Sequence, residues 1–367
     1  MKTHFLFYFL FHFFGMIEIA DAFPEMVRHN YINCSSCHVS PHGGGLMTEY
    51  GRHLSKELLS TWGKEGETNL LYGAIPTEKV KNWLNLGGGF RGIQVHQEDK
   101  NLRAGRWITM QLGVEVGLTW DQFTAVALVG KPESNEKFRE DSQRYYLLYQ
   151  PTEVFSMRAG KFLPTFGLNI PHHTIVTRSA LGLGQGQERE VVEANWIGPK
   201  MGFSVSAARQ VKNLVLQDPE LGYSAQFNVN VSDSYRLGSS LWSSSNLTTD
   251  RRIFGVHGIL GFTEKFYSLL EFDWMDRKET GQVPVRGFYH FGKLGYEVYQ
   301  GVHLLFMEDY SQADVQNSKT LQDSKGIGFA FYPRPHFEFE GIWFKKKINQ
   351  SSDQTFDYAW FLAHYYF

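Results

Sequence analysis

Two stretches of the chain alternate apolar and polar residues with a period of two, and this pattern restricts the fold more than any other feature. From Trp107 the chain reads WITMQLGVEVGLTW, with apolar residues at the even positions 108–118 and polar residues or glycine between them. The stretch YSAQFNVNVS, residues 223–232, repeats the alternation. A period of two places the two sets on opposite faces of a β-strand. Such strands belong either to a soluble sandwich or to a membrane barrel.

The lengths of the connections between these segments favour the barrel. We expect seven short turns, near residues 120–122, 151–153, 198–200, 232–234, 263–264, 299–301 and 334–335. Eight longer polar loops alternate with them, near residues 97–105, 132–143, 164–188, 212–221, 246–250, 278–284, 311–325 and 349–354. Seven turns and eight loops join sixteen strands. An even number of antiparallel strands with short turns at one end is typical of bacterial outer-membrane barrels.

Aromatic residues and charged strand faces agree with this interpretation. Clusters such as RYYLLYQP (144–151) and EFDWMDR (271–277) lie near segment ends, as in the aromatic girdles of membrane barrels. At the end of the sequence, WFLAHYYF carries an apolar stripe that resembles the C-terminal strand signal of outer-membrane proteins. The stripe begins one residue before this stretch and consists of Ala359, Phe361, Ala363, Tyr365 and Phe367. The opposite faces of other strands carry polar residues, among them Glu271, Asp273, Glu338 and Glu340. We therefore predict an all-β fold, a 16-stranded antiparallel transmembrane β-barrel with a polar lumen over residues 84–367.

The first 22 residues have the features of an export signal. Lys2 is followed by an apolar run over residues 5–19 and by Ala20-Asp21-Ala22, a small-x-small cleavage site. The protein is therefore expected to leave the cytoplasm. Its formal net charge of −2 implies no nucleic-acid partner.

The segment CSSCH, residues 34–38, contains the only two cysteines of the sequence. In an exported protein a cysteine pair can form a disulfide. A redox pair requires a βαβ context, and a zinc site requires four ligands, and neither is evident nearby. Cys-x-x-Cys-His is the attachment signature of c-type haem. We expect one covalent haem c, with Cys34 and Cys37 forming the thioethers and His38 ligating the iron.

The second axial ligand of this haem is left open by the sequence. Four residues of the surrounding segment are candidates, namely His29, His42, Met47 and His53, and five-coordinate iron is the remaining alternative. A methionine ligand would raise the reduction potential relative to a second histidine.

Residues 23–83 are expected to form a small α-helical haem module. Thr48 is placed as an N-cap, and Leu54, Leu58 and Trp62 follow at helical spacing. Gly43 to Gly45 form either a loop or a place where the backbone closely approaches a flat group. A segment of this size is expected to depend on the haem and on the barrel for its stability.

The longest predicted loop, residues 164–188, contains His172, His173 and Arg178. It either folds into the barrel and narrows it or lies outside as an external loop, and the sequence leaves both alternatives open.

Taken together, an export signal, a CxxCH motif and a 16-stranded barrel resemble the fused monohaem cytochrome c–porins of the outer membrane. The resemblance is carried by RHNYINCSSCH (28–38), YGR (50–52) and the terminal aromatic residue. Some members of that family are implicated in the oxidation of extracellular Fe(II). Separately, AGKFLPTFGLNIPHHTIVTR (159–178) resembles a strand-and-loop stretch of phosphate-selective-type porins. By position, the resemblance implies haem attachment at Cys34 and Cys37 and iron ligation by His38.

Two functions of different classes follow from these expectations. The first is electron transfer across the outer membrane, between a periplasmic c-type cytochrome or other redox carrier and an extracellular metal ion or other redox substrate. The alternative is a solute-diffusing porin with a haem-bearing plug or sensor module, located at the periplasmic side or within the lumen. A third, structural interpretation is a disulfide at CSSCH. No nucleophile–base arrangement or phosphate-binding loop is evident, so an electron-transfer protein is favoured over a conventional enzyme.

Overall fold

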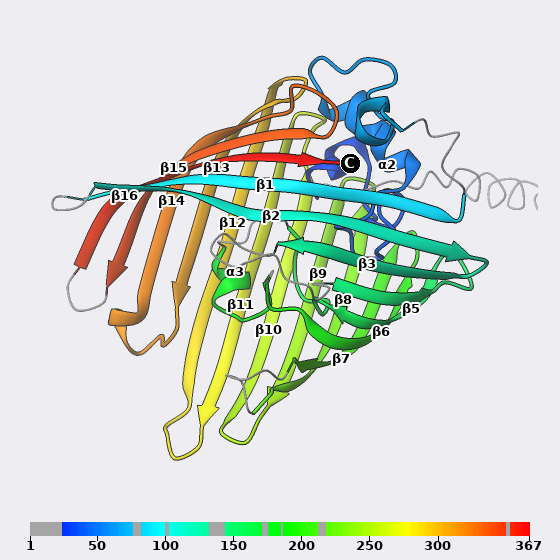
Figure 1. Ribbon diagram of the computed structural model, residues 1–367. Helices are drawn as coiled ribbons and strands as arrows, with labels where there is room; N and C mark the ends of the chain where they lie inside the picture. The colour runs from blue at the N-terminus through cyan, green and yellow to red at the C-terminus, as the bar shows by residue number, and fades with distance from the viewer. Residues whose placement is uncertain are drawn as a thin grey trace, which may run out of the picture.

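The computed structural model describes residues 24–75, 82–99, 103–131, 144–170, 175–184, 186–211, 218–349 and 353–367 (Figure 1). The predicted export signal, residues 1–22, lies outside the described residues, and so do His172 and His173.

Sixteen antiparallel strands close into a barrel, as predicted (Figure 1). The strands are β1 (Leu84–Glu98), β2 (Arg103–Trp120), β3 (Phe123–Lys131), β4 (Arg144–Tyr149), β5 (Phe155–Phe162), β6 (Arg189–Ile197), β7 (Met201–Gln210), β8 (Leu221–Ser232), β9 (Tyr235–Ser245), β10 (Thr249–Gly261), β11 (Phe266–Glu279), β12 (Val285–Tyr299), β13 (Val302–Gln312), β14 (Leu321–Phe331), β15 (Phe337–Asn349) and β16 (Asp353–Tyr366). All seven predicted turns and all eight predicted loops fall between these strands.

The barrel closes where β1 pairs with β16, from Gly89 opposite Tyr366 to Glu98 opposite Asp357. Because every strand has two neighbours, no strand is left with an unpaired edge. A closed ring is one of the two architectures that satisfy the backbone of a membrane-spanning chain.

The distribution of polarity is opposite to that of a soluble protein. In β7 the side chains of Phe203 and Val205 are exposed on the outside, whereas Ser204 and Ser206 are buried inside. In β8, Tyr223 is 58% exposed while Ser224 is buried. An apolar outer face around a polar interior is the pattern of a membrane barrel, so the predicted polar lumen is confirmed.

A bulge breaks the predicted strict alternation over residues 107–119 and puts Ile108 and Met110 on the interior side. The pairing of β1 with β2 contains a bulge, because Arg91 faces Gln111 and Gly92 faces Thr109, so that Met110 is an extra residue. Met110 is therefore buried in the interior, although Leu112 and Val114 of the same predicted face are exposed outside. A β-bulge shifts the side-chain alternation by one residue, and sequence periodicity does not reveal it.

The six short helices of the described residues are η1 (Pro24–His29), α2 (Glu49–Leu54), η2 (Ser55–Leu59), η3 (Leu70–Gly73), α3 (Val176–Ser179) and η5 (Ser318–Thr320). None of them is long and apolar enough to cross a membrane. Thr48 caps α2 as predicted, because its hydroxyl accepts a hydrogen bond from the Gly51 amide at 3.1 Å. Trp62 lies beyond the end of η2 rather than on the predicted helix, and it packs edge-on against Phe331 of β14.

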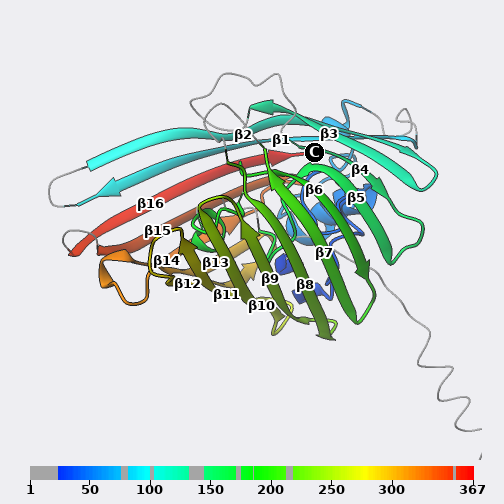
Figure 2. The same cartoon turned by 90° about the horizontal axis from the view of Figure 1, so that it is seen from below.

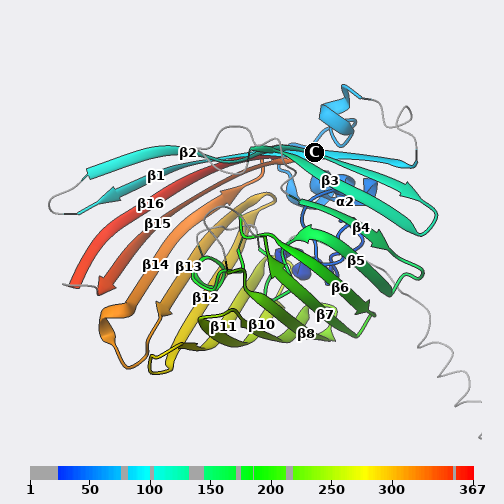
Figure 3. The same ribbon diagram turned by 60° about the horizontal axis from the view of Figure 1, so that its bottom comes forward.

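The segment 24–75, which we call the module, fills the end of the barrel that carries the short turns (Figures 2 and 3). Its outer part is hydrogen-bonded to those turns, since the Thr61 and Trp62 amides donate to Tyr332 and Pro333 carbonyls at 2.8 and 3.0 Å. Its inner part lies against the strands, where Arg28 pairs with Glu297 of β12. The inner part of the module therefore lies inside the ring of strands, and its outer part lies at the turns.

The long loop between β5 and β6 folds into the lumen, which decides between the two predicted alternatives. The guanidinium of Arg178 contacts both carboxylate oxygens of Glu271 on β11 at 3.0 and 3.1 Å, and both side chains are buried. The Gly167 amide donates to Ser240 on β9 at 2.9 Å. β9 and β11 are three and five strands away from β6 in the ring, so the loop reaches past its own strands and narrows the barrel from within.

Candidate cofactor cavity at the CSSCH segment

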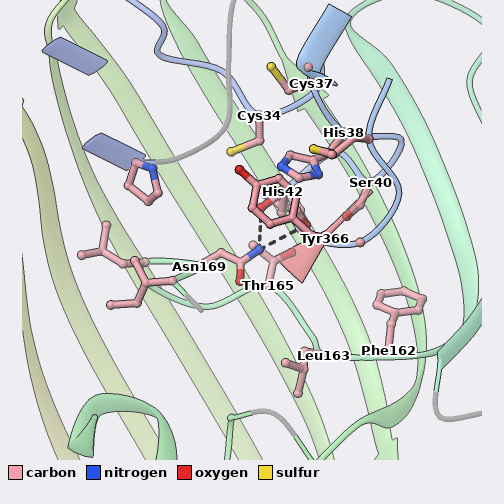
Figure 4. A pocket seen from close by; sticks show the side chains of 18 of the residues that line it. Cys34, Cys37, His38, Ser40, His42, Phe162, Leu163, Thr165, Asn169 and Tyr366 are labelled. Carbon is pink, nitrogen blue, oxygen red and sulfur yellow. Dashed lines mark hydrogen bonds between the residues drawn. The ribbon is translucent and has the colours of Figure 1, made fainter. Parts of the chain in front are cut away.

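A cavity of about 350 Å³ lies within the barrel, between the module and the inward-folded loop. Cys34, Cys37 and His38 all line it (Figure 4). Apolar side chains such as Met26 and Ile259 form part of its wall. The volume is within the range of roughly 300 to 1,000 Å³ that small-molecule and cofactor sites occupy.

The CSSCH segment forms a helical turn in which the His38 amide donates to the Cys34 carbonyl at 3.1 Å. Neither of the two cysteines, both in the described part of the chain, is joined in a disulfide. Cys37 is only 5% exposed, because α2 packs directly on it. A Cβ placed on Gly51 would lie 2.6 Å from the Cβ of Cys37, so only glycine allows this contact.

Gly43, Gly44 and Gly45 adopt φ angles of +79°, +73° and +74°, a left-handed conformation that favours glycine. They turn the chain back so that Met47 pairs with His38 in an isolated antiparallel bridge. A Cβ on Gly43 would be 3.4 Å from the Cys34 Sγ and 3.7 Å from the His38 Cδ2. The three glycines therefore form a loop, which is one of the two predicted alternatives, and this loop packs against the CSSCH side chains.

One wall of the cavity holds the loop after CSSCH in place. Ser40 accepts a hydrogen bond from Arg158 of β5 at 3.0 Å. The Nε2 of His42 lies 2.7 Å from Asn195 Oδ1 on β6 and 3.1 Å from Ser204 Oγ on β7. Burial lowers the pKa of His42 below its usual value, and the nearby Glu193 carboxylate only partly opposes this. His42 is therefore a neutral anchor of the module at pH 7.

The inward-folded loop contacts the same segment from the other end of the cavity. The side-chain amide of Asn169 donates to the carbonyls of His42 and Gly43 at 2.6 and 3.3 Å (Figure 4). The module and the loop are thus connected through the lumen.

The candidate second ligands are placed differently from one another. His29 and His53 do not line the cavity, and His53 is half-exposed and hydrogen-bonded to Thr68 at 3.2 Å. Met47 lines it, but its bridge with His38 puts the two side chains on the same face of a two-stranded pair. Axial ligands must approach iron from opposite faces, so this arrangement does not favour Met47. The assignment of the second ligand remains a prediction.

The opposite wall, built by β8, β9 and β10, contributes residues that the sequence did not single out. Asn228, Arg236, His257 and Ile259 line the cavity there. His257 is 6% exposed, and its Nε2 is 2.8 Å from Asn228 Oδ1. Only a correct strand register would have placed His257 on the lumen side, because it belongs to no motif.

These residues fit a c-type haem. Two thiols and an imidazole with the required spacing line one cavity, and Gly43 and Gly51 let the backbone pack closely against these side chains. The buried Nδ1 of His257 has no hydrogen-bond partner among the described residues, which is the condition of a nitrogen that could bind a metal.

Comparison with known proteins supports the barrel. No protein-family model and no curated protein matches the sequence. Among solved structures, an anion-selective porin from Comamonas acidovorans aligns with a TM-score of 0.60 at 10% identity, over 77% of this chain and 99% of the porin. OprB of Pseudomonas putida gives 0.60 at 8% identity, over 84% and 99%. The outer-membrane channel DcaP of Acinetobacter baumannii gives 0.55 at 12% identity, over 77% and 97%. The chain therefore has the fold of outer-membrane porins.

Proposed function

We propose that this protein is an outer-membrane channel whose short-turn end is filled by a module bearing one covalent haem c. The observation that carries the proposal is the position of CSSCH, since Cys34, Cys37 and His38 all line one cavity within the barrel. The porin fold of the solved relatives and the apolar outer face support a location in the bacterial outer membrane, in contact with lipid. By analogy with other such barrels, the short turns and the module would face the periplasm.

Cys34 and Cys37 would hold the haem, and His38 would ligate its iron. One-electron transfer is the chemistry that such a group supplies when it is bound. The chain's own residues enclose the site, since α2 covers Cys37 and Asn169 holds the following loop.

The first experiment tests for the covalent haem. The full chain, produced with a periplasmic haem-attachment system, should retain haem absorbance on a denaturing gel. The Cys34→Ser/Cys37→Ser variant should lose it while still folding as a heat-modifiable barrel. Haem that is absent from the unaltered protein, or retained by the variant, contradicts the proposal.

A second measurement tests the plug. In planar bilayers, a variant lacking residues 24–75 should conduct ions more strongly than the full chain. Equal conductance in the two proteins would show that the module does not occlude the lumen.

The second candidate function is electron transfer across the outer membrane, between a periplasmic carrier and an extracellular donor or acceptor such as Fe(II). It is favoured by the position of the CSSCH cavity within the lumen rather than on the surface, together with the resemblance to fused cytochrome–porins. The test uses protein oriented in liposomes with the module inside. A bulky non-permeant reductant added outside should change the haem spectrum, whereas a spectrum that changes only after detergent is added favours the plug alone.

A further inference from the structure

The two walls of the CSSCH cavity are built differently, and this difference identifies a candidate for the unassigned iron ligand. The loop 40–45 lies against the wall formed by β2 and β4–β7. Arg158 of β5 holds Ser40, and Asn195 and Ser204 hold His42. Gly43 in this loop lies against the imidazole of His38. His38 therefore lies on the side of this wall.

The facing wall belongs to β8, β9 and β10. Its described lining residues are Gln226, Asn228, Arg236, His257 and Ile259. Haem iron in proteins is ligated by histidine, methionine, cysteine or tyrosine. Within this set, His257 is the residue with such a group.

The hydrogen bonds of His257 leave one nitrogen available. Its Nε2 is 2.8 Å from the amide oxygen of Asn228, and an amide oxygen accepts, so Nε2 carries the proton. In a neutral imidazole the other nitrogen, Nδ1, then has the lone pair. Nδ1 is buried and makes no hydrogen bond to any residue in the described ranges. A buried acceptor without a partner is uncommon in folded proteins and calls for an explanation.

The ring of His257 is also held in a fixed place. A Cβ on Gly238 of β9 would lie 2.2 Å from the His257 Nε2, so the imidazole occupies space that only glycine leaves open. A metal-ligating histidine is typically oriented in this way, with its second nitrogen bonded to a neighbouring acceptor.

We propose that His257 is the second axial ligand of the haem held at Cys34 and Cys37, binding through the nitrogen that has no partner. Asn228 is a positioning residue that fixes the tautomer. The assignment rests on the proposed function, because it requires the haem. It means that a strand of the barrel, and not the module alone, completes the iron site.

The test is the spin state of the haem in the purified full-length protein. The unaltered protein should show the optical and EPR spectra of six-coordinate low-spin iron. His257→Ala should convert the ferric haem to high spin and allow the ferrous haem to bind carbon monoxide, and added imidazole should restore the low-spin spectrum. If His257→Ala fails to fold, His257→Gln keeps most of the side-chain volume and should show the same loss of the low-spin spectrum.

Asn228→Ala should shift the midpoint potential while keeping the iron low-spin.

Two matched controls separate ligation from packing. His303→Ala removes a buried histidine that does not line the cavity, and His53→Ala removes a half-exposed one, and both should remain low-spin. A low-spin His257→Ala protein that binds no carbon monoxide, or an unaltered protein that is already high-spin, would overturn the assignment while leaving the covalent haem in place. Absence of covalent haem from the unaltered protein would instead overturn the proposed function, and the assignment with it.

Discussion

The barrel and the module are stabilised by different means. Each strand of the barrel is hydrogen-bonded to two neighbours through a regular ladder, and the ring has no edge. The module has one six-residue α-helix and three short segments of other helix types, and many of its polar contacts are made to the barrel. The module therefore depends on the barrel for its stability. The barrel is expected to depend only weakly on the module. The following predictions test this asymmetry, from the largest expected effect to the smallest.

Arg178→Ala should destabilise the barrel most, because it leaves the Glu271 carboxylate buried without its partner. Removing one member of a buried ion pair costs about 3–5 kcal/mol. The free energy of unfolding in detergent, measured with urea, is the relevant quantity. As a control, Lys345→Ala breaks a half-exposed pair with Asp357, and a change of about 0–1 kcal/mol is expected. Equal losses in the two variants would contradict the role of the inward-folded loop.

Acidification should weaken the contact between module and barrel at His336, in the turn between β14 and β15. Burial lowers the pKa of His336 to about 4, against about 6.5 in an unfolded chain. The unfolded state therefore binds the proton first, and stability falls as the pH decreases from about 6.5 to about 4. The shift corresponds to about 3 kcal/mol at most. Thermal unfolding across this pH range should show the loss, and His336→Asn should reduce it. If His336→Asn loses stability over the same pH range as the unaltered protein, other titrating groups cause the loss.

Gly51→Ala should loosen the module without unfolding the barrel, because the added Cβ meets Cys37 at 2.6 Å. Overpacking of this kind costs about 1–3 kcal/mol. Maleimide labelling of Cys34 and Cys37 in the haem-free protein should become faster, whereas heat-modifiability of the barrel should not change. If the barrel unfolds as well, the module is a structural requirement of the barrel and the asymmetry is wrong.

Thr48→Ala should have the smallest effect, because it removes the N-cap of α2 and the hydrogen bond that the same hydroxyl donates to the Ser36 carbonyl. The loss of such a cap costs about 0.5–2 kcal/mol. The same thiol-labelling assay measures it, with Thr48→Ser as the control that keeps the hydroxyl. If Thr48→Ala and Thr48→Ser are labelled at equal rates, the cap does not hold α2 on Cys37.

The barrel could be predicted from the sequence because its constraints are local and repeated. A two-residue alternation and the lengths of successive connections determine strand number and lumen polarity, and both predictions were confirmed. The bulge at Met110 was missed, since an extra residue in one strand changes the pairing without changing the composition.

The cavity could be predicted only in part, because it is assembled from distant segments. Cys34, Cys37 and His38 were identified by their spacing, and the structure places all three on one cavity. Two further features depend on how the module is oriented inside the ring. They are the strands that hold His42 and the presence of His257 on the lining of the same cavity. Local sequence contains no information about that orientation.

The seam between β1 and β16 has a consequence for the paths by which the module can enter or leave the barrel. The hydroxyl of Ser55 in the module lies 3.4 Å from that of Tyr366, near the end of the last strand. A ring that closes at this seam leaves the module no sideways exit or entrance. Once the first and last strands have met, the module can enter or leave only along the axis of the barrel, through the end that carries the short turns.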